Sequence, residues 1–218
     1  MKPGDFFLSV LDFFAILLPG SLATWLVTRY VSPEDILRYL SLGSHTADGV
    51  TLWVAFLLCS YVLGHFVFMA GSELDTSYDR WRRRQNPQSR DKTFRAADDL
   101  RRKILVSLPE SEKFSTLKWA KSYIQIHSPE ARIEIDKLEA ESKFFRSLVV
   151  VLTAVALHFL VTDRAPGMGV AFLILAVMAY LRFCQQRWKL TELSYATAVI
   201  LYTTKGTASE AIAPAKAG

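Results

Sequence analysis

Cysteine is scarce in this sequence, and the short motifs that mark many enzymes are missing. The 218 residues include two cysteines, Cys59 and Cys184, which lie in apolar stretches and form no CxxC pair. They provide no disulfide framework, and we expect both to act as small packing residues. The chain also has no P-loop, no dinucleotide-binding fingerprint, no HExxH sequence and no Cys/His metal set. These absences argue against a soluble-type enzyme, and we predict no catalytic residue, no cofactor and no metal ion.

Long apolar stretches alternate with charged ones, which is unusual for a soluble domain of this size. Hydrophobic residues make up 51% of the chain and charged residues 22%. A membrane-crossing helix needs roughly 20 apolar residues. We therefore predict an all-α, polytopic membrane protein with four transmembrane helices and a helical cytoplasmic domain. The candidate spans are residues 6–30, 51–70, 148–161 and 169–183.

The distribution of basic residues predicts the orientation in the membrane. Of the 26 lysines and arginines, 17 fall between Arg80 and Arg146. Basic segments of modest length stay on the cytoplasmic side of a bilayer. The start of the second span should therefore lie outside, and both chain termini should lie in the cytoplasm. We expect a multi-pass protein of the bacterial inner membrane, with the lipid bilayer as its first partner.

Helix-start patterns and breaks divide the chain into five predicted parts. Ser32 and Ser128 are each followed by Pro and Glu, which is typical of a helix N-terminus. After Ser128 nothing interrupts the helical pattern until about residue 162, so the third span should extend into the cytoplasm as a stalk. The parts are a transmembrane hairpin at 1–71 (spans 6–30 and 51–70, outer amphipathic helix 33–42), a basic helical region ending in the stalk at 72–146, a second hairpin at 147–185, a cytoplasmic C-terminal helix at 186–204 and a flexible tail at 205–218.

Ionisable and helix-breaking residues interrupt the predicted spans. Asp12 and His65 each lie about six residues from the cytoplasmic end of a span, so both sit roughly 9 Å deep and could pair. His158 lies nearer the outer side. Such groups are candidates for ion or proton passage or for a catalytic dyad; alternatively, they form hydrogen bonds that stabilise the helix bundle. Pro19 and Gly20, at the centre of the first span, predict a hinge.

Acidic and basic residues follow the second span. Ser72, Glu73 and Asp75 stand at its cytoplasmic mouth, where the acids could attract cations. No G-x-S-x-G sequence surrounds Ser72, which argues against a serine hydrolase. An arginine cluster comes next; it could bind an anionic ligand or a lipid headgroup, or simply obey the charge rule for membrane topology. The cluster consists of Arg80, Arg82, Arg83 and Arg84. We do not expect nucleic acid as a partner.

Three functions fit this architecture. A small four-span chain without catalytic motifs resembles, as a class, the membrane-disrupting effectors of bacterial antiviral systems. That resemblance implies a homo-oligomeric effector or channel-like pore, acting in bacterial defence or stress and gated by its cytoplasmic helices. The first alternative is a membrane anchor whose basic helices recruit a cytoplasmic protein. The second is an intramembrane enzyme that acts on lipid through Asp12 and His65.

Overall fold

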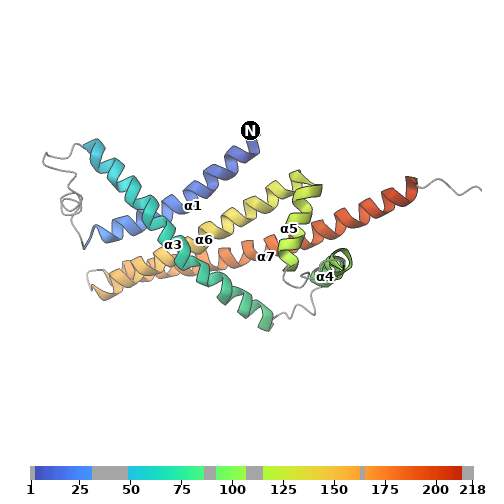
Figure 1. Cartoon of the computed structure of the whole chain (residues 1–218). Helices are drawn as coiled ribbons and strands as arrows, with labels where there is room; N and C mark the ends of the chain where they lie inside the picture. The colour runs from blue at the N-terminus through green and yellow to red at the C-terminus, as the bar shows by residue number, and fades with distance from the viewer. Residues whose placement is uncertain (1–2, 31–48, 86–91, 107–114, 163–164, 213–218) are drawn as a thin grey trace, which may run out of the picture. The chain divides into compact units, whose positions relative to one another are not determined.

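Six α-helices make up the part of the chain that the computed structural model describes, which is residues 3–30, 49–85, 92–106, 115–162 and 165–212 (Figure 1). The prediction of an all-α protein is confirmed. The outer helix predicted at 33–42 lies outside the described residues. The helices are α1 (Pro3–Val27), α3 (Gly49–Gln85), α4 (Lys92–Leu105), α5 (Thr116–His127), α6 (Pro129–Val161) and α7 (Pro166–Ile212).

Local sequence accounts for where several helices begin. The Ser115 side chain caps α5 by accepting a hydrogen bond from the amide of Lys118 at 3.3 Å. The Ser128 side chain does the same for α6, accepting from the amide of Ala131 at 3.4 Å. Both α6 and α7 have proline at their first position, where its missing N–H group leaves no hydrogen bond unmade. These local features favour a helix start at the first residues of α5, α6 and α7.

The three longest helices continue past their apolar segments without a break. α6 runs over 33 residues, as expected for a span joined to a stalk. α3 continues through the arginine cluster to Gln85. α7 includes residues 205–212, which the sequence interpretation placed in the tail. α1 is also continuous, with Pro19 inside it. A helix satisfies its backbone hydrogen bonds internally, so it can pass from lipid to water uninterrupted.

Three helices are long and apolar enough to cross a membrane. They are Leu52–Arg80 within α3, Pro129–Val161 (α6) and Pro166–Thr204 within α7. The corresponding part of α1 is a shorter apolar helix, Ala15–Val27. The chain is therefore a candidate multi-pass membrane protein with three such helices in its described part, and the fourth span stays a prediction.

The described contacts divide the chain into two compact units. Unit 1 comprises residues 1–78 and 140–185, and unit 2 comprises residues 79–139 and 186–218. α3, α6 and α7 contribute residues to both units, whereas α4 and α5 belong to unit 2 alone. Most of Leu52–Arg80 falls in unit 1, whereas Pro129–Val161 and Pro166–Thr204 each run through both units.

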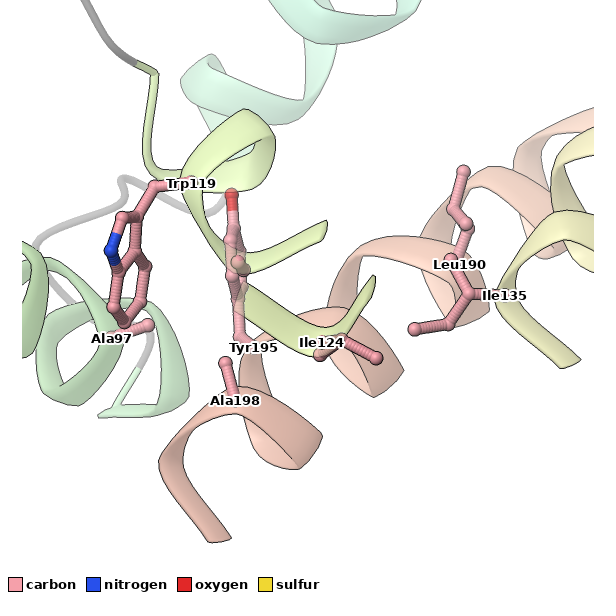
Figure 2. Packing of buried hydrophobic residues seen from close by; sticks show 8 residues of the cluster. Ala97, Trp119, Ile124, Ile135, Leu190, Tyr195 and Ala198 are labelled. Atoms are coloured by element: carbon pink, nitrogen blue, oxygen red, sulfur yellow. The ribbon is translucent and has the colours of Figure 1, made fainter. Parts of the chain in front are cut away.

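Unit 2 has its own hydrophobic core, to which α4, α5, α6 and α7 all contribute (Figure 2). The Trp119 ring lies beside Ala97, and Ile135 lies beside Leu190 (Figure 2). The apolar sides of α4 and α5 are thereby removed from water, which drives the packing of unit 2. The buried members are Ala97, Trp119, Ala120, Ile124, Ile135, Leu190, Tyr195 and Ala198.

Removing one buried methyl group from α5 tests this core. Ile124 is fully buried, whereas Ile126, two residues later, is 76% exposed. We expect Ile124→Val to lower the free energy of unfolding by about 0.5–1.5 kcal/mol, because the lost methyl leaves a small cavity. Ile126→Val should change it by less than about 0.5 kcal/mol. Denaturant titration of the full chain in detergent, followed by Trp fluorescence, measures both; equal effects would contradict the core.

Candidate functional site

The backbones of α1 and α3 approach closely in unit 1 at a crossing built from small residues (Figure 1). A Cβ atom added at Gly20 would overlap the carbonyl of Ser60 and lie 2.8 Å from the amide nitrogen of Gly64. A Cβ atom added at Gly64 would overlap the carbonyl of Ile16. Small residues that let backbones meet are the usual means of helix association in membranes. The two glycines therefore allow this contact.

Two hydroxyl groups are buried in the same crossing. The Ser60 hydroxyl donates to Oγ1 of Thr24 at 3.1 Å, and the Thr24 hydroxyl donates to the carbonyl of Gly20 at 2.9 Å. A buried hydroxyl without a partner would be unfavourable in an apolar environment, and this chain of bonds satisfies both. Neither Thr24 nor Ser60 is among the predicted site residues. The signal that could have indicated them is the four-residue spacing of small residues, from Gly20 to Thr24 and from Ser60 to Gly64.

A buried arginine links α3 to α6, also within unit 1. Arg146 is 6% exposed, and its Nη1 atom pairs with Oδ2 of Asp75. Its guanidinium carbon lies 4.6 Å from the centroid of the Phe68 ring. A Cβ atom added at Gly71 would lie 3.2 Å from Cγ of Arg146. Phe68, Gly71 and Asp75 are spaced three and four residues apart, so one side of α3 holds the whole arginine side chain.

A second contact ties α3 to α7, one turn after Asp75. Tyr78 and Phe183 are both buried, and their ring centroids lie 5.7 Å apart at an interplanar angle of 69°. This edge-to-face arrangement is favourable for aromatic pairs. α3 is therefore fixed to two other helices near the end of its unit 1 segment. We call this group the α3 clasp; it consists of Phe68, Gly71, Asp75, Tyr78, Arg146 and Phe183.

The residues predicted at the cytoplasmic mouth separate into different environments. Asp75 is half-buried and belongs to the clasp. Ser72 and Glu73 are exposed, and the Ser72 hydroxyl donates to the carbonyl of Met69 on its own helix at 2.6 Å. Asp75 therefore serves an interhelical ion pair, Glu73 is exposed, and a cation site at this mouth stays a prediction.

The predicted pairing of Asp12 with His65 stays a prediction, because the Asp12 side chain lies outside the described part of the chain. His65 is exposed, and its ring lies edge-to-face against Tyr61, with centroids 4.7 Å apart. Both residues stand on a side of α3 that otherwise carries exposed apolar side chains, among them Leu58, Val62, Phe66 and Met69. A polar pair thus interrupts an apolar helix face.

His158 has a partner on α1. A hydrogen bond joins the Tyr30 hydroxyl to Nδ1 of His158 at 2.5 Å. Phe159, the next residue, lies 6.2 Å from Trp25 of α1 and 5.8 Å from Phe172 of α7, measured between ring centroids. His158 therefore lies at one edge of an aromatic cluster that joins three helices of unit 1.

The Tyr30–His158 bond should contribute little to stability. Tyr30→Phe keeps the ring and removes the hydroxyl, and interhelical hydrogen bonds in membrane proteins contribute about 0.6 kcal/mol on average. We expect a loss of that size in the free energy of unfolding, measured by denaturant titration in detergent. Tyr202→Phe, at a tyrosine exposed on α7, is the matched control and should change nothing measurable. A loss above about 2 kcal/mol would exceed the contribution of a single interhelical hydrogen bond in a membrane protein and would contradict this prediction.

Part of the arginine cluster is engaged within unit 2. The Arg82 guanidinium lies 4.1 Å from the centroid of the Trp188 ring, and its Nη1 atom donates to the Thr191 hydroxyl at 3.1 Å. Arg80 is exposed, and the side chains of Arg83 and Arg84 lie outside the described residues. Arg82 thus joins α3 to α7, and an anionic ligand would have to rely on the other arginines.

α5 carries a ladder of three rings on one side. Trp119 stacks on Tyr123 with centroids 5.5 Å apart, and Tyr123 stacks on His127 at 4.1 Å. Burial raises the pKa of the Tyr123 hydroxyl, and the neighbouring Tyr202 raises it further. The Tyr123 ring packs between those of Trp119 and His127.

In the described ranges, no three His, Cys, Asp or Glu side chains are grouped so that they could hold a metal ion. Comparison of the chain with known protein families, with curated proteins and with solved structures finds no match. The function therefore has to be inferred from the geometry within each of the two units.

Proposed function

We propose that this chain is a multi-pass protein of the bacterial inner membrane, with unit 1 in the bilayer and unit 2 on the cytoplasmic side. The exposed apolar side chains of the candidate spans support this placement: only 11% of the most apolar segment of α3 is buried, and only 22% of that of α7. Soluble monomers rarely expose apolar surface on this scale. The basic residues of α3 that follow its apolar part support the cytoplasmic placement of unit 2.

We further propose that several copies assemble in the membrane and act as a channel-like effector controlled through unit 2. The observation that carries this proposal is the position of His65 and Tyr61 on an exposed, otherwise apolar side of α3. An ionisable side chain that faces lipid is unfavourable, whereas one that faces another copy or a water-filled path is not. Thr24, Ser60 and His158 are bonded within one copy. A conducting path would therefore form between copies.

Reconstitution into liposomes tests this proposal. We expect covalent cross-linking to trap oligomers in the bilayer, and ion flux that changes when His65 is replaced by leucine. His127→Leu is the matched control, because His127 lies on α5 in unit 2, outside the proposed path. Liposomes that hold only monomers and show no flux under any condition would overturn the effector proposal.

A membrane anchor is the second candidate, and the independent core of unit 2 favours it. α4 and α5 complete a packed module whose surface displays basic side chains, which could recruit a cytoplasmic protein. Exposed examples are Arg95, Arg102, Lys103 and Lys118. If the chain is an anchor, the full chain in detergent should retain an acidic protein and lose it when these four residues become glutamine. The same chain in liposomes should produce no ion flux. Flux without such a partner would exclude the anchor.

A further inference from the structure

We propose that the Asp75–Arg146 pair is a latch that holds α3 against α6 in the resting state of the membrane effector. This inference depends on the proposed function and assigns the control of that function to two residues. It makes the pair a conformational switch: intact, the pair favours the closed arrangement, and broken, it lets α6 move relative to α3.

The position of the pair along both helices supports this role. Asp75 lies three residues before Tyr78, the last residue of unit 1 on α3, and Arg146 lies six residues after Ala140, where α6 enters unit 1. The pair therefore lies within unit 1, close to the end of the unit 1 segment of both helices.

The hydrogen bonding of Arg146 is incomplete, which distinguishes the pair from a purely structural ion pair. Its Nε atom is buried without a hydrogen-bond partner in the described part of the chain, and so is the Ser147 hydroxyl beside it. A buried charge that is only partly satisfied leaves the closed arrangement less favourable than a fully bonded network would. Such a contact holds the helices together less firmly than a fully bonded network would.

The rest of the α3 clasp indicates which helix would move. Tyr78 and Phe183 tie α3 to α7 through buried aromatic rings that carry no charge. Their contact does not depend on Asp75. α6 is packed on α7 as well, through a buried cluster that includes Leu152 and Ala176. Breaking the ion pair would thus release α3 from α6 while α6 stays on α7, so the motion we infer is a displacement of α3 relative to α6.

Ion flux in liposomes tests the latch. We expect Asp75→Asn to raise the flux about tenfold or more over the wild type, because loss of the pair shifts the population toward the open form. Glu134→Gln, at an exposed acid on α6, is the matched control and should leave the flux unchanged. Equal, measurable flux from wild type and Asp75→Asn would overturn the latch and leave the effector function standing. No flux from any protein would overturn both proposals.

A disulfide between α3 and α6 provides a second test if Asp75→Asn does not fold. Cysteines replace Gly71 and Arg146 in a Cys59→Ser and Cys184→Ser background. The two thiols should be close enough to form a disulfide, because a Cβ atom at Gly71 lies 3.2 Å from Cγ of Arg146. The oxidised form should be closed and the reduced form should conduct. The same flux in both forms would contradict the latch.

Discussion

Gly64→Leu is expected to separate α1 from α3 and to lower the free energy of unfolding by about 3 kcal/mol or more. Even a Cβ atom at this position overlaps the Ile16 carbonyl, and a backbone group cannot rotate away as a side chain can. The helices would have to move apart, which would also break the Ser60–Thr24 hydrogen bond in the crossing.

Gly49→Leu is the matched control for this change. Gly49 is the first residue of the same helix, and a Cβ atom there meets nothing within 4 Å. Both variants add the same side chain to the same helix, and only Gly64→Leu meets another backbone, so a large difference between them reports the crossing. Titration with SDS in mixed micelles, followed by far-UV circular dichroism, gives both values. If Gly64→Leu matched Gly49→Leu, α1 and α3 would not meet as described.

Asp75→Asn is expected to have a comparable effect, about 3–5 kcal/mol, because it leaves the Arg146 charge buried without its partner. Glu73→Gln removes an exposed acid two residues away and should change the free energy of unfolding by less than about 0.5 kcal/mol. The same SDS titration measures each variant.

Removing both charges should restore most of this stability. The double variant Asp75→Leu with Arg146→Met has no buried ion to pair, and apolar replacements of buried ion pairs are often neutral or stabilising. A double variant as unstable as Asp75→Asn, or a harmless Asp75→Asn, would show that Arg146 does not depend on Asp75.

Local pattern was enough to predict the helices but not their contacts. The Ser-Pro-Glu start and the unbroken run after it predicted α6, because capping and propensity act over a few neighbouring residues. Asp75 was grouped with Glu73 as an acidic mouth. Its partner Arg146 comes 71 residues later on another helix, and sequence spacing gives no information about such a contact.

The contacts of the other candidate residues could not be predicted for the same reason: they join residues that are far apart in the sequence. Arg82 was predicted as a ligand-binding residue, and its stacking on Trp188 of α7 depends on how α3 and α7 pack. Thr24 and Ser60 are ordinary in sequence and gain their role only where two backbones meet. Four spans were predicted from apolar runs; three correspond to long apolar helices in the described part of the chain, and the fourth, on α1, stays a prediction.

Labelling of single cysteines from outside intact cells tests the central claim, the membrane placement of the two units, most directly. In a Cys59→Ser and Cys184→Ser background, one cysteine replaces Gly167 at the start of α7 and another replaces Gln125, exposed on α5. The account predicts that an impermeant maleimide labels position 167 in intact cells and position 125 only after the cells are opened. Labelling of position 125 in intact cells would contradict it.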